Sequence, residues 1–541
     1  MYHRLKMDKI LWIKKIYNFN LFIDTQKITE IQKQFGIALS VFRSIHPSKN
    51  GILLTQIVED YESTIKLAAA SKVIADEKKL TIHTYDVHIH KSIGWADENQ
   101  NTFDRFFKTP KEIIHENFSK KTIFRNDEKY HDQKLVIKEL ARIRKEVNSR
   151  EDLLKVQIDG LLVGDLIYDT YLRFFHQPTI FNIDNNVFQI VEIAINIFYN
   201  FKLFLKNNNV KCIVNTFAGY IQHAIPVRIA DEAGIEIFTM GSKSYLIQKY
   251  DDKFPYCSIN HTKFRPDRTL PEGAIELAEG ILSTRLKGGV DPATYYMKES
   301  SFAVKPFIKE LTDKFNEKAR NIVIYAHEFY DAPHINRKLQ FPDLFQYLNE
   351  VLKNLVDLDD TNVFIKTHPG GMTGTKEVAI ELIESFNASH FHVLDETVSN
   401  VQIVHLRPDI VATARGSVGV EMSYFEIPVI ALYDNPYVNF NFVHTCYDKE
   451  TYFDILKGKE FVQSPYSKTD IYSYYYQAFL EQKILKESNV YTFLSSFDGD
   501  TYNDEYLEYL FSNGFSKRRK ELISHYEKSL KNIRAEQAQL K

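Results

Sequence analysis

Short apolar runs alternate with longer amphipathic stretches along most of this 541-residue chain. Several runs have the length and β-branched content of buried strands: KLTIHTYDVHI, VKCIVNTF, GIEIFTM, NIVIYAH, TNVFIKTHP, HFHVLDE, DIVATA and IPVIALY. Stretches between them, such as FPDLFQYLNEVLKNLVDL and TKEVAIELIESFN, repeat apolar positions every three or four residues and predict helices. Strands that alternate with helices predict an α/β fold with parallel sheets.

The strand signal weakens between about residues 262 and 318, where RPDR, LPEG and KGGVDP indicate turns. A chain of this length exceeds what one hydrophobic core usually organises, so two domains are expected. We predict an N-terminal α/β domain over residues 1–260, a connection over 261–318, a C-terminal Rossmann-like domain over 319–500 and a helical tail over 501–541.

Composition narrows the class of protein. The chain is 44% hydrophobic and 26% charged, with a formal net charge of −3, so it has no polyanion-binding footprint and we expect no nucleic-acid partner. Cys212, Cys257 and Cys446 lie far apart, which indicates neither a zinc site nor a disulfide framework and fits a reducing compartment. No run reaches the roughly 18 apolar residues of a membrane span, and the start lacks a signal peptide. We expect a cytoplasmic protein.

The two ends leave a membrane contact open. MYHRLKMDKILWIKKIYNF interleaves basic and aromatic residues, and SKRRKELISHYEKSLKNIRAEQAQLK predicts a charged helix. Either could lie on the anionic inner face of the plasma membrane or against a partner. A frayed start and a solvated last helix are the alternative interpretation.

Ligands of open parallel sheets bind at the carboxyl ends of the strands, so residues just after each strand are the candidate site. NIVIYAHEFYDAPH places His327, Glu328, Asp331 and His334 there, and Pro333 prevents a helix. This polar loop is expected to face a ligand. The spacing of its histidines and carboxylates does not match a tetrahedral site, so we expect no metal.

A second strand end, NVFIKTHPGG, carries Lys366, His368, Pro369 and Gly370. Pro369 disfavours a helix at His368 and holds it extended, and the glycine lets a ligand approach the backbone. A lysine and a histidine two residues apart at a strand tip suit a phosphate. A turn histidine bound to the backbone is the alternative.

A third strand end, VATARGSVGVEM, places Arg415, Gly416 and Ser417 between a strand and a helix start. Backbone N–H groups at a helix start bind anions, and Gly416 removes the side chain that would block close approach. Glu421, one turn later, faces the same side as Ser417 and could accept hydrogen bonds from a ribose. A capping serine and a surface glutamate are the alternative.

The second and third motifs occur in the order and spacing of a known family. Residues 319–445 resemble the capsule-polysaccharide group of GT-B glycosyltransferases, which includes the Kdo transferases of capsule linkers and is more distantly similar to bacterial polysialyltransferases. The resemblance rests on KTHPGG and ATARGSVGVEMSYFEIPVIAL, while AHEFYDAPH and VGDLIYDTYLR look like segments of surface-polysaccharide transferases. It implies a GT-B-like fold, with two Rossmann-type domains whose parallel sheets face each other across a cleft.

The resemblance also implies a metal-independent transfer and roles for single residues. His368 would contact the donor phosphate, Gly416 and Ser417 would hold it, and Glu421 would bind the ribose. The donor would be a nucleotide sugar that needs no other cofactor, with CMP-Kdo or a CMP-sialic acid favoured over UDP- or GDP-sugars. The acceptor would be a growing surface polysaccharide or a lipid-linked glycan.

The resemblance to GT-B enzymes implies that the N-terminal domain, residues 1–260, is the acceptor side and supplies the base that activates the acceptor. In VGDLIYDTYLRFFHQP, Asp165 and Asp169 lie one helical turn apart, so one could deprotonate an acceptor hydroxyl and the other bind it. His223, after the strand in VKCIVNTF, is a third candidate. A helix cap is the alternative for Asp165, and Arg228 is expected to be part of the scaffold.

Two departures from the family leave the donor open: Arg415 stands where a small or hydroxyl residue is common, and Glu426 and Ile427 replace the glycine before Pro428. Two other functions also remain. A polyol-phosphate transferase of the teichoic-acid type resembles the same arrangement but uses a CDP-alcohol. A non-catalytic, transferase-like scaffold for polysaccharide assembly would bind no nucleotide.

Overall fold

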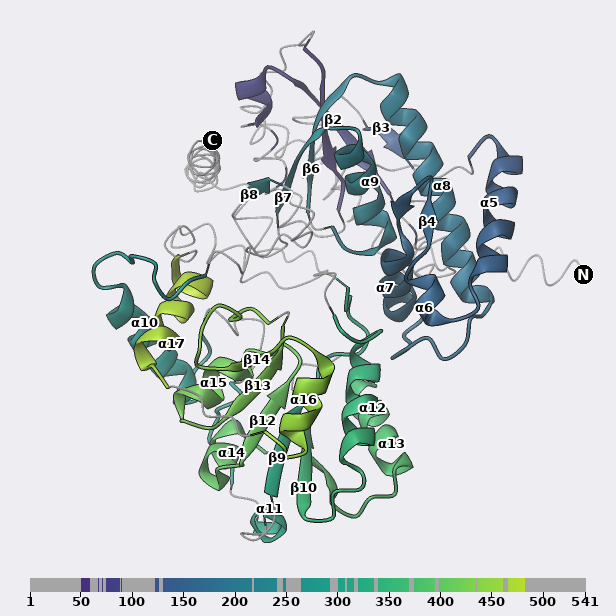
Figure 1. The fold of residues 1–541 in the computed structure, drawn as a ribbon. Coiled ribbons are helices and arrows are strands. Elements are labelled where there is room, and N and C mark those ends of the chain that lie inside the picture. The colour runs from purple at the N-terminus through teal and green to yellow at the C-terminus, as the bar shows by residue number, and fades with distance from the viewer. Residues whose placement is uncertain are drawn as a thin grey trace, which may run out of the picture.

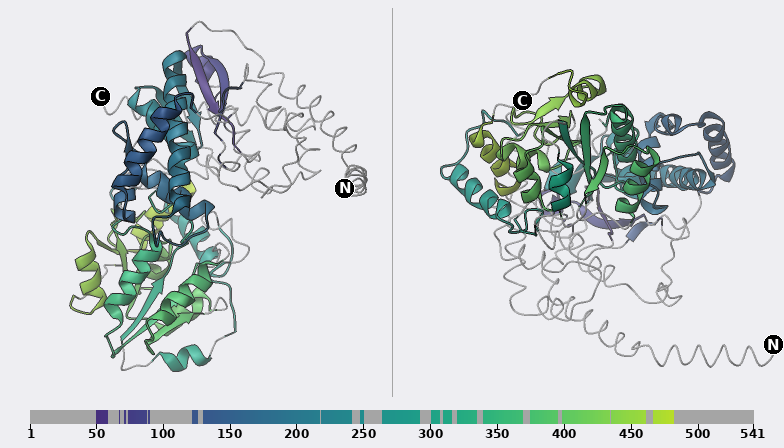
Figure 2. Two further views of the ribbon diagram at one scale, coloured as in Figure 1. Left: turned by 90° about the vertical axis from the view of Figure 1, so that its right-hand side faces the viewer. Right: turned by 90° about the horizontal axis from the view of Figure 1, so that it is seen from below.

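Two β-sheets, one in each half of the described chain, organise the fold (Figure 1). The halves are stacked end to end, as Figure 2 shows from the side. The computed structural model describes residues 50–58, 67, 71, 74–87, 89, 122–125, 130–216, 218–240, 247–249, 264–291, 300–306, 309–315, 320–334, 339–368, 374–394, 398–433, 435–460 and 466–481.

The N-terminal sheet has the strand order β3-β2-β1-β6-β7-β8, with every neighbouring pair parallel except β7 and β8. Its strands are β1 (Ile52–Gln56), β2 (Thr81–Asp86), β3 (Thr122–Arg125), β6 (Val210–Asn215), β7 (Glu236–Met240) and β8 (Ile247–Lys249). The same half contains α5 (Gln133–Glu146), α6 (Arg150–Leu153), the hairpin of β4 (Gln157–Ile158) and β5 (Leu161–Leu162), α7 (Gly164–Phe174), α8 (Asn185–Asn207) and α9 (Tyr220–Glu232).

The C-terminal sheet is parallel throughout, in the order β11-β10-β9-β12-β13-β14. Its strands are β9 (Arg320–Tyr325), β10 (Thr361–Lys366), β11 (Phe391–Leu394), β12 (Ile410–Thr413), β13 (Val429–Leu432) and β14 (His444–Cys446). Its helices are α10 (Ala274–Leu286), α11 (Lys309–Lys314), α12 (Leu344–Leu355), α13 (Thr375–Ser385), α14 (Asn400–Leu406), α15 (Val418–Tyr424), α16 (Lys449–Leu456) and α17 (Lys468–Tyr475), followed by the π-helical turn η3 (Tyr476–Leu480).

Burial on both faces explains why the strand sequences are continuous apolar runs. Ile322, Val323 and Ile324 are successive residues of β9, and all are fully buried. Side chains of successive strand residues point to opposite faces, so both faces of this strand must be covered by helices. The helix α12 begins at its cap Asp343, whose side chain accepts the N–H of Gln346, and it buries an apolar stripe against the sheet.

The helix α8 is the one described helix that is long and apolar enough to cross a membrane on length and composition. In the fold, 56% of its most apolar window is buried. It packs against α5, α7 and α9, and its inward residues belong to the core of the N-terminal half.

The α/β, GT-B-like fold of two Rossmann-type domains is confirmed. Taken in chain order, the strands of the C-terminal sheet lie as 3-2-1-4-5-6, which is the Rossmann order, and the five parallel strands of the N-terminal sheet follow the same scheme. Each predicted strand is present. The strands β1, β3, β8 and β14 and the hairpin of β4 and β5 were not predicted from the sequence.

The expected connection over residues 261–318 packs, in its described part, with the C-terminal half. Phe264, Leu282 and Phe302 are buried in the same core cluster as residues of β12 and β13. Figure 1 shows α10 lying beside α17, which follows the sheet in sequence. The predicted tail over 501–541 and the basic-aromatic start lie outside the described residues.

Gly164 begins α7 where no side chain fits, because a Cβ there would overlap the carbonyl oxygen of Leu153 and lie 2.8 Å from the nitrogen of Val156. We predict that Gly164→Ala lowers stability by about 1–3 kcal/mol, the usual cost of overpacking. The measurement is the thermal unfolding midpoint. Gly280→Ala in α10, where nothing lies within 4 Å of the added Cβ, is the matched control and should be neutral or stabilising. A Gly164→Ala protein as stable as the parent would contradict this packing.

Candidate functional site

The loops after β9 and β12 meet where the C-terminal sheet changes its crossover direction. These strands are neighbours, with Thr413 paired to Tyr325 at their carboxyl ends. His327, after β9, accepts the backbone N–H of Arg415 at its Nε2 over 3.2 Å. Thr413 Oγ1 lies 3.1 Å from the same nitrogen. The sequence therefore places two of the expected motifs in one site, at the position where ligands bind in open α/β sheets.

The hydrogen bonds define the state of His327. Its Nε2 accepts from Arg415, so the neutral ring carries its proton on Nδ1, and the Thr413 hydroxyl donates to Nε2 while accepting the N–H of Gly416 over 3.1 Å. Burial, followed by the charges of Arg415 and His368, lowers the pKa of His327 to about 3. His327 is therefore a neutral ring that fixes the loop after β12.

Gly416 lies between Thr413 and Tyr437. Its carbonyl accepts the hydroxyl of Tyr437 over 2.8 Å, and a Cβ at this position would lie 2.9 Å from Thr413 Oγ1. At the start of α15 the N–H groups of Gly419 and Val420 donate to the carbonyls of Gly416 and Ser417, and the N–H groups of Ser417 and Val418 precede them. With only seven residues, α15 offers an anion little dipole. Anion binding here would depend on these N–H groups and the exposed Ser417 hydroxyl.

Glu421 is buried under the loop, where a surface glutamate was the alternative expectation. Its Oε1 accepts from the Arg285 guanidinium and its Oε2 accepts from Asn400 over 2.8 Å. Arg285 also donates to Ser417 Oγ over 3.2 Å and lies 3.7 Å from Asp291. Both carboxylate oxygens of Glu421 are engaged, so the side chain anchors the loop in this structure, and its contact with a ribose stays a prediction.

Lys366 and His368, which were expected to bind a phosphate together at the carboxyl end of β10, have different surroundings in the structure. Lys366 is buried and its ammonium donates to the carbonyl of Val398 over 2.5 Å, so it stabilises the fold. Burial lowers the pKa of His368, against the charges of Glu328 and Asp331, so the ring is neutral at pH 7. Pro369 and Gly370 lie outside the described residues.

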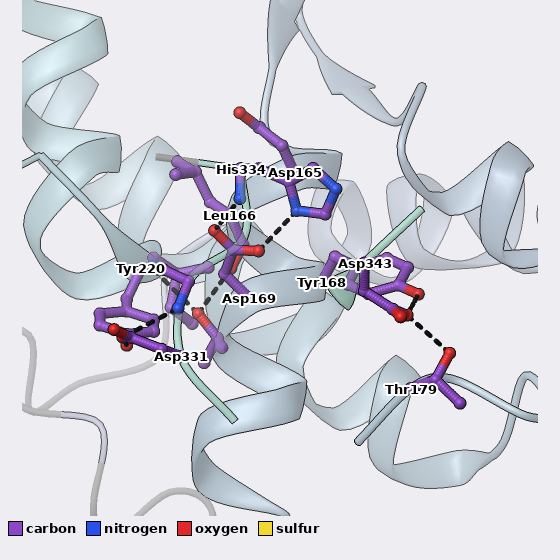
Figure 3. Close-up of polar contacts among 12 residues, drawn as sticks. Asp165, Leu166, Tyr168, Asp169, Thr179, Tyr220, Asp331, His334 and Asp343 are labelled. Atoms are coloured by element: carbon purple, nitrogen blue, oxygen red, sulfur yellow. Dashed lines mark hydrogen bonds and ion pairs between the residues drawn. The ribbon is translucent and has the colours of Figure 1, made fainter. Parts of the chain in front are cut away.

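The rest of the loop after β9 contacts the N-terminal half (Figure 3). His334 Nδ1 lies 2.6 Å from Asp169 Oδ1, and its backbone N–H donates to Asp169 Oδ2 over 3.3 Å. Asp331 Oδ1 accepts the hydroxyl of Tyr220 over 3.0 Å. Asp331, His334 and Asp169 were expected to bind ligands, and in the structure they join the two domains.

A second contact between the domains is centred on Asp343, the cap of α12. Its Oδ2 accepts the hydroxyl of Tyr168 over 2.5 Å and that of Thr179 over 2.6 Å (Figure 3). Burial raises the pKa of Asp343 and of Tyr168. The short helix α7 thus faces the C-terminal domain with both Tyr168 and Asp169.

Asp165 has a structural partner. Arg228 of α9 donates to both of its carboxylate oxygens, at 2.7 and 2.6 Å, and both side chains are less than 8% exposed. Arg228 is part of the buried scaffold, as expected. His223, the third candidate base, is half-buried with its Nδ1 2.7 Å from Gln56 Nε2 at the carboxyl ends of β1 and β6. Of the three candidate bases, His223 is the one at a sheet switch point.

The structure also gives roles to residues that the sequence analysis did not single out: Arg285, Asn400, Asp343 and Tyr437. Arg285 is separated from Ser417 by 132 positions, and no local pattern indicates such a contact. Among the described residues, no group of three or more His, Cys, Asp or Glu is placed to hold a metal ion.

No family model and no curated protein matches the chain. Among solved structures, it is similar to Thermosulfurimonas dismutans KpsC, a β-Kdo 2,4 transferase, with 11% identity, 49% of this chain and 79% of that chain covered, and a TM-score of 0.31. It is also similar to S. aureus MnaA with UDP, with 11% identity, coverage of 84% and 100%, and a TM-score of 0.26. The UDP-GlcNAc 2-epimerase of Methanocaldococcus jannaschii is similar with 10% identity and a TM-score of 0.23, and the match covers 78% of this chain and 96% of that chain. Likenesses this distant do not indicate the activity of the chain.

Removing one partner of a buried ion pair leaves the other charge uncompensated, which typically costs about 3–5 kcal/mol. We predict that Asp165→Asn lowers the free energy of unfolding, measured by urea denaturation, by an amount of that order. The double variant Asp165→Asn, Arg228→Gln removes both charges and should recover much of the loss. A single variant with the stability of the parent would contradict a structural role for Asp165.

Proposed function

We propose that the chain is a glycosyltransferase that moves a sugar from a nucleotide-activated donor to a glycan or glycolipid acceptor. The donor would bind at the carboxyl ends of β9, β10 and β12, and the acceptor would approach from the N-terminal sheet. CMP-activated acidic sugars such as Kdo or a sialic acid are favoured because of the sequence resemblance. A UDP- or GDP-sugar is the alternative donor.

One observation carries the proposal. Three loops that the sequence marked independently begin at adjacent strand ends, and two of them bond to each other at the switch point through His327 and Arg415. The site combines a glycine turn, the exposed residue Ser417, whose hydroxyl also bonds to Arg285 and Glu421, and the half-buried Arg415. A phosphate needs such N–H, O–H and cationic partners.

The chemistry needed is modest. The acceptor oxygen forms a bond to the anomeric carbon, the bond from that carbon to the phosphate oxygen breaks, and the electron pair leaves with the phosphate. A neutral His368 can donate one hydrogen bond to a phosphate oxygen as negative charge develops there. His223 remains the candidate base, and no metal is part of the proposal. Placement at the inner face of the plasma membrane also stays a proposal.

Nucleotide binding can be tested by placing a negative charge at Ser417. We predict that a saturating nucleotide from a panel of CMP, CDP, UDP and GDP raises the melting temperature of the parent. A ligand at a hundred times its dissociation constant adds about 2.7 kcal/mol to the free energy of unfolding. Ser417→Asp should abolish this shift through repulsion of the phosphate. Ser385→Asp, at an exposed position on α13, is the matched control and should keep it.

The outcomes separate the candidate functions. A shift with CMP supports the favoured donor class. Turnover of a CDP-alcohol, with no turnover of a nucleotide sugar, would identify a polyol-phosphate transferase. An unchanged shift in Ser417→Asp would place the site elsewhere, and no shift with any nucleotide would favour a scaffold.

The role of His368 makes a kinetic prediction. If it stabilises the departing phosphate, His368→Ala should slow sugar transfer and the slow hydrolysis of donor by water alike, by about a hundred- to a thousandfold. His223→Ala, if it removes a base, should slow transfer far more than hydrolysis. Released nucleotide measures both reactions. Loss of transfer with unchanged hydrolysis in His368→Ala would exclude the leaving-group role.

A further inference from the structure

The two domains have separate hydrophobic cores. One cluster of buried apolar side chains contains residues between Leu54 and Ile237, and the two others contain residues between Phe264 and Leu480. The contacts described above between the halves are polar, and a further contact stacks His176 on Tyr330 with ring centroids 3.8 Å apart. Domains joined in this way can move relative to each other unless specific contacts hold them.

The Asp169 and His334 contact is a buried pair of a carboxylate and an imidazole between the domains. The Asp169 side chain is 2% exposed and the His334 side chain is 9% exposed. They come from α7 and from the loop after β9, 165 positions apart. A charged carboxylate in such a place is stable only when a cation or several donors face it.

We propose that Asp169 and His334 form a proton-linked lock, which holds the two domains together when His334 is protonated and loosens as the pH rises. This inference is independent of the proposed transferase activity. It requires only that the two sheets keep their own cores while the contact between them opens.

The groups around the lock determine its sign. Burial lowers the pKa of His334, but the charge and hydrogen bond of Asp169, with the charges of Asp165 and Asp343, outweigh this effect and raise it above its usual value. Burial raises the pKa of Asp169 to about 6, although His334 opposes the change. Tyr168, whose ring lies edge-on to His334, has its pKa raised and stays neutral.

Both pKa values are higher in the closed arrangement than in separated, solvated side chains. The closed form therefore binds more protons, and it loses stability as the pH rises from about 4 to 6 through Asp169 and above about 6.5 through His334. Above the raised pKa of His334, Asp169 is a buried carboxylate that faces a neutral ring. Of the two side chains of the lock, His334 is the one that titrates above pH 6.5.

A second feature makes the lock reversible. Among the described residues, the buried Nε2 of His334 has no hydrogen-bond partner. Closing the domains therefore withdraws this nitrogen from water without compensation, whereas opening them lets water bind it. Closing forms the ion pair between Asp169 and His334, which stabilises the closed form, but it also removes water from His334 Nε2, which destabilises that form. The two effects oppose each other and bring the open and closed forms closer in free energy.

The test measures the distance between the domains without any ligand. Cysteines replace the exposed residues Lys138 of α5 and Glu381 of α13 and carry spin labels, and Cys257→Ser removes a native cysteine that could also be labelled. Pulsed electron paramagnetic resonance then measures the distance between the labels. At pH 6.5 one short-distance population should dominate. Up to pH 9, the ratio of long- to short-distance molecules should rise by up to about tenfold per pH unit while His334 releases its proton.

Three variants decide the assignment. The double variant Asp169→Asn, His334→Gln keeps polar side chains of similar size and should lose the pH response. His334→Gln alone should favour the long-distance form at every pH, because it leaves the Asp169 carboxylate without a cation. His176→Gln, which removes the exposed histidine that stacks on Tyr330, is the matched control and should respond as the parent does. A parent distance that does not change with pH, or a double variant that still responds, would overturn the lock.

Discussion

A parallel sheet whose crossovers run in both directions has one point where neighbouring strands send their following loops apart. In the C-terminal sheet this point lies between β9 and β12, and the register from Ile410 with Ile322 to Thr413 with Tyr325 brings both strands to an end at the same level. The loops after them therefore begin side by side before they run to opposite faces of the sheet, whatever their sequences. This constraint makes a site from segments that are 86 positions apart, as His327 and Thr413 are.

Buried charges then hold these loops in one arrangement. Arg285 with Glu421 fixes the turn after β12, and Asp165 with Arg228 fixes α7 against α9. Such pairs contribute little net stability relative to an apolar core, but breaking one costs several kcal/mol, so they favour one geometry over others. Several side chains that resemble catalytic groups in the sequence, such as Asp165 and Glu421, therefore have positioning roles in the structure. Fewer side chains are left to contact a ligand than the sequence indicated.

The strands, the Rossmann class and the strand-end loops could be predicted because they depend on local apolar runs and on glycine and proline residues that end helices and strands. The partners of those loops could not. Nothing near Arg285 indicates that it lies under Ser417, and the pattern of α7 shows that Asp165 and Asp169 share a face but not that one meets Arg228 and the other His334. Long-range pairing between charged residues is determined by the packing of whole elements, which single-sequence patterns do not encode.

The proposed function requires a nucleotide to bind at the switch point of the C-terminal sheet, between β9 and β12. Hydrogen–deuterium exchange with and without saturating CMP, CDP, UDP or GDP, read by mass spectrometry, maps such a site directly. We expect slower exchange in peptides that cover residues 325–334 and 413–424, with little change in β1 and β6 of the N-terminal sheet. Protection confined to the N-terminal sheet, or no protection by any nucleotide, would contradict it.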